Sequence, residues 1–311
     1  MYPWRRILIP TDFSTASEWA FDDAIQVAAR SAAELIILHI RITQTSKPDA
    51  LRFPLDDAAY DYAEQQELNA LRERVRRANS NVKTRLVVRK SPDPGEAVCS
   101  SAKSEAADLI VVATHARHHV AHLLIGSTTM SVISDPPAPI LAIRYGIPKR
   151  AQWKRIVVPV HRQQTTEAAA ELAGNVARDQ KCEVDLLIAY ESDRAAAEKQ
   201  VDDVARRWFE GVPLKRAVIA ATDVEKMILK YTAESGADIV FVNSGRGIGD
   251  VKREVIRHIG TPVMIVPPTR PAGGWRVASF SMDRFAIREL GVEKEILPPD
   301  MLGQLVFPFR R

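Results

Sequence analysis

The sequence has little of several features that mark special classes of protein. It holds two cysteines in 311 residues, Cys99 and Cys182, and this excludes a disulfide framework. No apolar stretch approaches the roughly 20 residues of a membrane-spanning helix. The apolar run near the N-terminus is also too short for a secretory signal. We therefore expect a cytoplasmic protein without membrane insertion.

A large excess of one charge is also missing. The chain has 43 basic and 39 acidic residues, mixed along its length, so charge does not indicate a nucleic-acid partner. It contains no G-x-x-x-x-G-K-[ST] phosphate loop and no G-x-S-x-G nucleophile turn. Cys99 lies in a helical pattern, which favours a buried over a reactive thiol. Enzyme activity is thus not indicated, although Asp12 could activate water or hold Mg²⁺.

What the sequence does contain is an internal repeat. Four pairs of segments match in the same order: 5–12 with 154–161, 33–40 with 182–189, 107–113 with 237–243, and 138–143 with 261–266. We define residues 1–147 as the first repeat and 152–268 as the second repeat, and we predict that each is a domain. Residues 269–311 match neither and form a C-terminal extension.

The matched segments predict buried strands, because they are short runs rich in Ile, Val and Leu. Helical patterns lie between them, at 11–30 with Ser14 as N-cap, at 57–79, at 94–104 and at 165–177. Further strands are predicted at 84–89 and 215–220. The order βαβαβαβαβ in each repeat predicts an α/β fold of two tandem, doubly wound parallel-sheet domains, Rossmann-like.

Ligands of such folds bind at the carboxyl ends of the strands. In the first repeat one of these ends carries the stretch THARHHVAHLLIGST, residues 114–128. Its histidines, at positions 115, 118, 119 and 122, would share one face of a helix and could bind a transition metal. No carboxylate or thiol completes the set, so we expect a solvated loop and no metal. Added positive charge near a phosphate is a third interpretation.

Two motifs resemble the universal stress protein family. ILIPTDFSTAS, residues 7–17, nearly reproduces the ILVPTDFSEAS typical of that family. Its members also carry G-x-x-G, nine residues and then G-S or G-T, and here that frame reads Ala113-Thr-His-Ala116, nine residues, Gly126-Ser127. The resemblance covers about 1–147 well and 152–268 more loosely.

The resemblance implies a regulatory protein that binds ATP or another adenine nucleotide, with or without Mg²⁺. Asp12, at the end of the Pro10-Thr11-Asp12 motif, would hold adenine or ribose, and the main chain near Ile40 would hold the base. A helix that begins at Gly126-Ser127 would direct its N–H groups to a phosphate. The implied phosphate-loop positions are Ala113, His115, Ala116, Arg117, Gly126, Ser127 and Thr128.

The sequence departs from the family pattern at several positions. Alanine replaces two glycines, at Ala113 and Ala116, and a positive φ there would cost about 1 kcal/mol. In the second repeat His161 stands in place of Asp12, and the span from strand four to strand five is seven residues shorter. We therefore expect the second repeat to be mainly structural or to serve in pairing.

Pairing and partners are predicted from the strand ends and the tail. Universal stress proteins commonly pair through their last strand, so 139–143 and 262–266 are expected to pair within the chain as a pseudo-dimer. A homodimer through further contacts is also expected. A short helix is predicted at 283–290, and the tail holds four of the nine phenylalanines. Residues 272–311 could pack on the protein's own domains or grip a protein partner.

Three hypotheses about function are compatible with these patterns. The first is a nucleotide-binding stress or regulatory protein. The second is a nucleotide-independent scaffold that binds a protein through residues 272–311. The third is a slow ATPase or phosphotransferase that uses Asp12. Identification of any nucleotide that the purified protein releases separates the first hypothesis from the second.

Overall fold

The structure is a computed structural model that describes residues 4–43, 57–114, 126–147, 152–161, 167–244 and 255–268. All of these residues fall in one compact unit, 1–276. The C-terminal extension, with the helix predicted at 283–290, lies outside the described residues. In the part of the chain that is described, no helix is long and apolar enough to span a bilayer.

The two repeats form the same series of elements. The first repeat consists of β1 (Arg6–Thr11), α1 (Thr15–Ser31), β2 (Glu34–Ile42), α2 (Asp57–Ala78), β3 (Thr84–Ser91), α3 (Pro94–Ser104), β4 (Leu109–Ala113), α4 (Ser127–Ser134) and β5 (Ile140–Ile143). The second repeat consists of β6 (Arg155–Val160), α5 (Glu167–Gln180), β7 (Glu183–Tyr190), α6 (Arg194–Trp208), β8 (Leu214–Ala220), α7 (Val224–Ser235), β9 (Ile239–Asn243), a helical turn at 255–258 and β10 (Val263–Val266).

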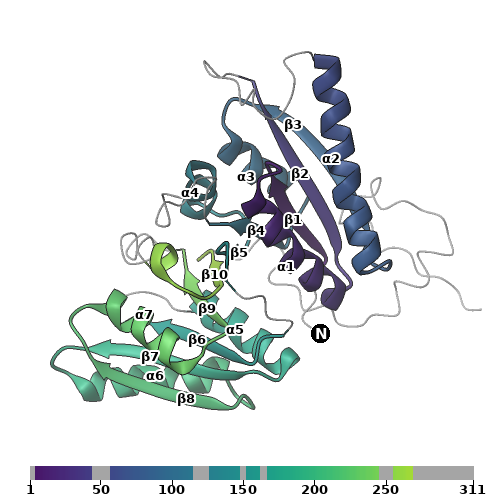
Figure 1. Ribbon diagram of the computed structural model, residues 1–311. Coiled ribbons are helices and arrows are strands. Elements are labelled where there is room, and N and C mark those ends of the chain that lie inside the picture. Colours follow the sequence, from purple (N-terminus) through teal and green to yellow (C-terminus); the bar gives the residue numbers. More distant parts are fainter. Residues whose placement is uncertain are drawn as a thin grey trace, which may run out of the picture. The chain divides into compact units, whose positions relative to one another are not determined.

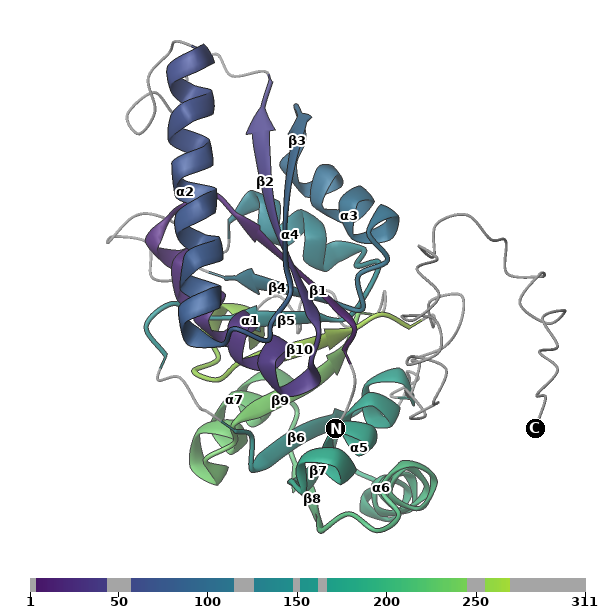
Figure 2. The ribbon, with the colours of Figure 1, turned by 90° about the vertical axis from the view of Figure 1, so that its right-hand side faces the viewer.

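The strands make a single sheet in the order β3-β2-β1-β4-β5-β10-β9-β6-β7-β8 (Figures 1 and 2). Neighbours within each repeat are parallel, whereas β5 and β10 are antiparallel, with Leu141 opposite Met264. The predicted α/β class with doubly wound parallel sheets is confirmed, and so is the predicted pairing of the two last strands. Whether each repeat folds as an independent domain stays a prediction.

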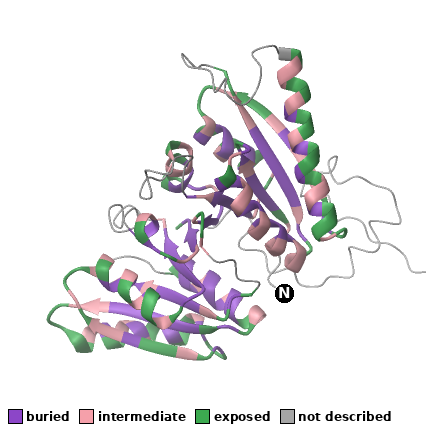
Figure 3. Cartoon of the chain, viewed as in Figure 1, coloured by how far each residue is buried: buried purple, intermediate pink, exposed green. Residues whose placement is uncertain are grey.

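The central strands are mostly apolar because both faces of the sheet are covered there, whereas the edge strands β3 and β8 are largely half-exposed or exposed. In β1, Ile7 and Ile9 pack with α1 and α2 on one face, whereas Leu8 packs with α3 and α4 on the other. The second repeat is arranged in the same way, with α5 and α6 on one face and α7 on the other. In Figure 3 the buried residues gather along the central strands and on the helix faces that cover them, and the exposed residues lie on the outer faces of the helices and on the edge strands.

Capping side chains explain where the helices begin. Ser14 Oγ accepts a hydrogen bond from Ser17 N at 3.3 Å, so α1 starts after the predicted N-cap. Asp93 Oδ1 accepts from Gly95 N and Glu96 N at 2.9 and 3.0 Å, and Pro94 occupies the first helical position of α3. The predicted ranges of α1, α2 and α3 are therefore confirmed within a few residues.

Within the part of the sheet that each repeat contributes, the direction in which successive strands are added reverses at the first strand. β1 lies between β2 and β4, and β6 correspondingly lies between β7 and β9. From β1 the chain runs outward to β2 and β3, and then crosses back to β4 on the other side of β1. The carboxyl ends of β1 and β4 therefore flank the place where an open α/β sheet binds ligands.

Candidate functional site

The turn after β1 places Asp12 at the protein surface, at the position where the strand order reverses. We call this position, at the carboxyl ends of β1 and β4, the switch point of the first repeat. Asp12 is exposed, and its Oδ1 accepts a hydrogen bond from Ser14 N at 3.0 Å. Thr11 is buried, and its Oγ1 accepts from Phe13 N at 3.0 Å. Two side chains thus satisfy the backbone of the turn locally, in the manner of Asx and Thr turns. The turn directs the chain from β1 into α1 with the Asp12 carboxylate on the solvent side.

Phe13 holds this turn in an unusual conformation. Its φ is 57°, in the left-handed region, which costs a residue with a Cβ roughly 1–2 kcal/mol. The Phe13 ring is almost completely buried, and its centroid lies 4.5 Å from that of His39 on β2. Burial of a phenylalanine side chain contributes about 1.5–3 kcal/mol, enough to offset the strain.

The start of α4 supplies backbone donors next to the end of β4. The first intrahelical bond runs from Met130 N to Gly126 O at 2.9 Å, so the N–H groups of residues 127–129 lie before the helical ladder. The N-cap, Gly126, provides no side-chain cap. Thr129 Oγ1 donates to Ala113 O at 3.0 Å and so fixes this helix end to the carboxyl end of β4. Such a helix start attracts anions.

The structure brings part of the predicted site together. β1 and β4 are paired with Ile7 opposite Leu109, and each strand ends four residues later, at Thr11 and Ala113. Ile40 is half-buried on β2, one residue beyond the pair formed by Thr11 and His39, and Pro10 is half-buried on β1. Eight of the eleven predicted residues therefore lie at the carboxyl ends of β1, β2 and β4 or at the start of α4: Pro10, Thr11, Asp12, Ile40, Ala113, Gly126, Ser127 and Thr128.

Several other predicted residues lie outside the part of the chain that the structure describes. His115, Ala116 and Arg117 lie outside the described residues, as do the histidines at 118, 119 and 122. Ala113 is described, and it ends β4 without a positive φ, so the strain considered for it does not arise. Among the described residues, no group of three or more His, Cys, Asp or Glu is placed to hold a metal ion.

A buried polar cluster beneath the β1 turn was missed by sequence reasoning. His39 Nδ1 lies 2.9 Å from the carbonyl oxygen of Thr11, and its Nε2 lies 3.5 Å from Glu64 on α2. Both groups are almost inaccessible to solvent. Arg41 forms two hydrogen bonds to Glu64, one of them from Nε at 2.7 Å, and an ion pair with Asp61 at 2.6 Å. The available signals were a histidine within an apolar strand and a glutamate on the buried face of a helix.

The protonation state of His39 follows from this environment. Burial lowers its pKa below the ordinary 6.5, although the bond to Thr11 and the charge of Glu64 oppose the shift. Neutral imidazole has one N–H, and a carbonyl oxygen only accepts, so Nδ1 carries the proton. Hydrogen bonds from Arg41 to Glu64 raise the pKa of the guanidinium further, so Arg41 remains charged.

The second repeat fills the equivalent position with its own side chains. Asn243 stands where Ala113 stands in the first repeat, and its Oδ1 accepts from Ala169 N of α5 at 2.8 Å. Gln200 Nε2 donates to the carbonyl oxygen of His161 at 2.7 Å. His161 replaces Asp12, and burial lowers the pKa of its imidazole. At the corresponding position of the second repeat, hydrogen bonds from the protein's own side chains thus connect the strand ends to α5 and α6.

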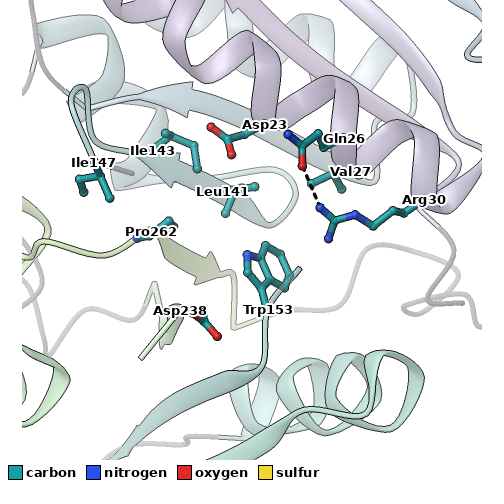
Figure 4. A pocket seen from close by; sticks show the side chains of 10 residues that line it. All are labelled: Asp23, Gln26, Val27, Arg30, Leu141, Ile143, Ile147, Trp153, Asp238 and Pro262. Atoms are coloured by element: carbon teal, nitrogen blue, oxygen red, sulfur yellow. Dashed lines mark hydrogen bonds between the residues drawn. The ribbon is translucent and has the colours of Figure 1, made fainter. Parts of the chain in front are cut away.

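A separate pocket lies where the repeats meet. In Figure 4, side chains of α1 and β5 face Trp153, Asp238 and Pro262 across it, and Arg30 Nη2 donates to Gln26 Oε1 at 3.1 Å. The pocket encloses about 20 Å³, room for about one water molecule. Small-molecule sites typically exceed ~300 Å³. The strand ends, not this pocket, are the candidate site.

Comparison with known proteins finds a family that resembles the first repeat. The profile described as the universal stress protein family matches residues 3–144. A universal stress protein of Methanocaldococcus jannaschii is 29% identical over 154 residues, a match that covers 45% of this chain and 95% of that protein.

Two solved structures share the fold over most of both chains. A universal stress protein from Archaeoglobus fulgidus has a TM-score of 0.69 at 18% identity, covering 85% of this chain and 98% of that one. A protein of unknown function from Pseudomonas aeruginosa has a TM-score of 0.60 at 12% identity, covering 85% and 93%. Residues 3–144 are therefore similar to the universal stress protein family, and the chain shares its fold with these solved structures.

Proposed function

We propose that the first repeat binds ATP or a related adenine nucleotide at the carboxyl ends of β1, β2 and β4. The observation that carries this proposal is the placement of two complementary elements at one switch point. The exposed Asp12 carboxylate ends β1, and the α4 start, without a side-chain cap, follows β4. The match of residues 3–144 to the universal stress protein family supports the same assignment.

The donor set fits a phosphate. The N–H groups of residues 127–129 precede the first helical bond, and the dipole of α4 adds positive potential at this end. Phosphate oxygens are acceptors only, so a cluster of backbone donors suits them and disfavours a cation. Gly126 has a φ of −59°, so a glycine is not required here for a left-handed turn. Without a side chain, it would let a phosphate approach the backbone closely.

The opposite end of the site fits a nucleoside. A carboxylate accepts hydrogen bonds from ribose hydroxyls or from an exocyclic amine, and Asp12 is exposed for that contact. Ile40 offers a half-buried apolar side chain beside the β2 backbone, a suitable surface for a purine ring. The nucleotide would then extend from β2 across β1 towards α4.

We propose one such site per chain. In the second repeat the Asn243 amide reaches the amino end of α5, and His161 lacks the carboxylate that Asp12 supplies. We assign that repeat to structure and to pairing through β10. The nucleotide would regulate the conformation or the partners of a cytoplasmic protein, which could form homodimers.

The decisive experiment is calorimetry of the full chain with ATP, AMP and inorganic tripolyphosphate, each with and without Mg²⁺. We expect one adenine nucleotide per chain and at least tenfold weaker binding by Asp12→Asn, because a charged hydrogen bond contributes about 1.5–3 kcal/mol. Exposed Asp135, which follows α4, provides the control Asp135→Asn, which should bind normally. Failure of the wild-type chain to bind any adenine nucleotide would overturn the proposal.

Catalysis can be separated from binding in the same samples. The proposal assigns Asp12 to ligand contact, so hydrolysis of ATP should be absent or should persist unchanged in Asp12→Asn. Turnover that disappears with Asp12→Asn while ATP still binds would favour the slow ATPase instead.

A further inference from the structure

The two repeats allow a comparison of residues at the same place in the fold. His39 lies opposite Thr11 in the β1–β2 register, and Ile188 lies opposite Val160 in the β6–β7 register. Both side chains are almost fully buried. The fold therefore accepts an apolar residue at this position, and histidine occurs in the repeat that also has Asp12.

His39 contacts both ends of the turn that presents Asp12. Its Nδ1 donates to the carbonyl oxygen of Thr11 at 2.9 Å, directly before Asp12. Its ring lies 4.5 Å from the ring of Phe13, directly after Asp12, at an interplanar angle of 32°. Phe13 is the residue with φ of 57°. One side chain thus restrains both neighbours of the carboxylate.

His39 is itself held from α2. Its Nε2 lies 3.4 Å from the Tyr60 hydroxyl and 3.5 Å from Glu64. Arg41 binds Glu64 and lies with its guanidinium carbon 5.0 Å from the centre of the Tyr60 ring. In the second repeat the buried residues of α6 are all apolar, Ala197, Val201 and Ala205. Among the described residues, a buried carboxylate on the helix that follows the second strand is thus found in the first repeat and not in the second.

We propose that His39 is a positioning residue of the nucleotide site, which holds the Thr11–Phe13 turn so that Asp12 faces the ligand. In this proposal the Tyr60 hydroxyl of α2 donates to the unprotonated Nε2 of His39, and Arg41 of β2, bound to Glu64, packs on the Tyr60 ring. The inference rests on the proposed function, because its ligand is the same adenine nucleotide. It adds a residue that touches no ligand, and it links α2 to the nucleoside end of the site.

The test is a thermodynamic cycle of His39→Ile and Asp12→Asn in the full chain, with ATP and tripolyphosphate as ligands. His39→Ile copies the second repeat, so we expect it to fold. If His39 acts through Asp12, each single variant weakens ATP binding about tenfold and the double variant is no weaker than Asp12→Asn alone. Tripolyphosphate, which would contact only the α4 end, should bind all variants equally.

Conservative variants separate positioning from general destabilisation. His39→Asn keeps an N–H donor for Thr11 and should recover much of the affinity lost in His39→Ile, even though both lose the ring contact with Phe13. Tyr60→Phe should weaken ATP binding more than Tyr62→Phe, since the Tyr60 hydroxyl lies 3.4 Å from His39 Nε2 whereas Tyr62 is exposed on the same helix. If His39→Ile does not fold, the second comparison still tests the inference, and equal ATP binding by its two variants would overturn it.

The outcomes distinguish the two proposals. Wild-type protein that binds no adenine nucleotide overturns the proposed function and this inference with it. Wild-type protein that binds ATP, together with His39→Ile that binds it equally well, overturns only the inference. A double variant whose loss of ATP affinity equals the product of the two single losses would also overturn only the inference, because it would show that His39 does not act through Asp12.

Discussion

Asp108 and Asp238 make the same pair of contacts in the two repeats. Asp108 Oδ2 accepts hydrogen bonds from Arg5 N and Arg6 N at 2.8 and 2.9 Å. Asp238 Oδ2 accepts from Lys154 N and Arg155 N at 2.6 and 2.9 Å. Each aspartate stands just before the fourth strand of its repeat and satisfies the backbone at the start of the first strand. The repeated sequence therefore repeats a long-range bond as well as a strand pattern.

Replacement of these aspartates should destabilise the fold unequally. Asp238 is buried and Asp108 is half-buried, so we expect Asp238→Ala to lower the free energy of unfolding by about 3 kcal/mol and Asp108→Ala by about 2 kcal/mol. The exposed Asp135 offers the control Asp135→Ala, expected within about 0.5 kcal/mol of wild type. Denaturant unfolding measures all three. Equal, small losses would contradict the assigned role.

The ends of α1 and α5 offer a stabilising change. Ala32 follows α1 with a φ of 50°, and Lys181 follows α5 with a φ of 56°. Glycine adopts this conformation without the strain that a Cβ causes, and it is the preferred residue after a helix. We expect Ala32→Gly and Lys181→Gly each to raise the free energy of unfolding by about 0.5–1 kcal/mol. Ala29→Gly, inside α1, should instead lower it by about 1 kcal/mol.

Local sequence signals were enough to predict the elements. Asp93-Pro94 marks the start of α3, and the apolar runs mark the strands, because these features act on neighbouring residues. Five of the eight described site residues lie at the carboxyl ends of strands and the other three at the start of α4, but their contact with a ligand stays a prediction.

The contacts between elements could not be predicted in this way. His39 and Glu64 meet only because α2 packs on β2, across 24 intervening residues. The change from Ala113 to Asn243 is visible in the repeat, but its bond to Ala169 requires the folded sheet.

Asn243 should stabilise the second repeat as a distant helix cap. Its Oδ1 accepts from the buried N–H of Ala169 in the first turn of α5, so Asn243→Ala leaves that donor without this acceptor. We expect a loss of about 1–2 kcal/mol in the free energy of unfolding. Asn243→Asp keeps the acceptor and should retain most of the stability. If both variants lose the same amount, the cap is not the cause.

The stability of the protein should fall as the pH drops below about 6.5, in part because of His39. Folding lowers the pKa of this imidazole, mainly by burial, so the unfolded chain binds the proton more tightly. The contribution of neutral His39 is therefore complete above pH 6.5 and is lost as the pH falls towards the lower pKa of the folded state. Charged or polar groups that face the ring lie on three elements: Thr11 and Asp12 after β1, Arg41 on β2, and Tyr60 and Glu64 on α2.

The check is denaturant unfolding of wild type and His39→Asn at pH 7.5, 6.5 and 5.5. We expect a smaller loss of stability between pH 7.5 and 5.5 in the variant, because asparagine does not titrate. Some of the slope should remain, since burial also lowers the pKa of His161. The variant His161→Asn should remove part of that remainder, and the two reductions should add because the residues belong to different repeats. A pH dependence that is identical in wild type and His39→Asn would show that the pKa of His39 is the same in the folded and unfolded states, and would contradict the lowered pKa.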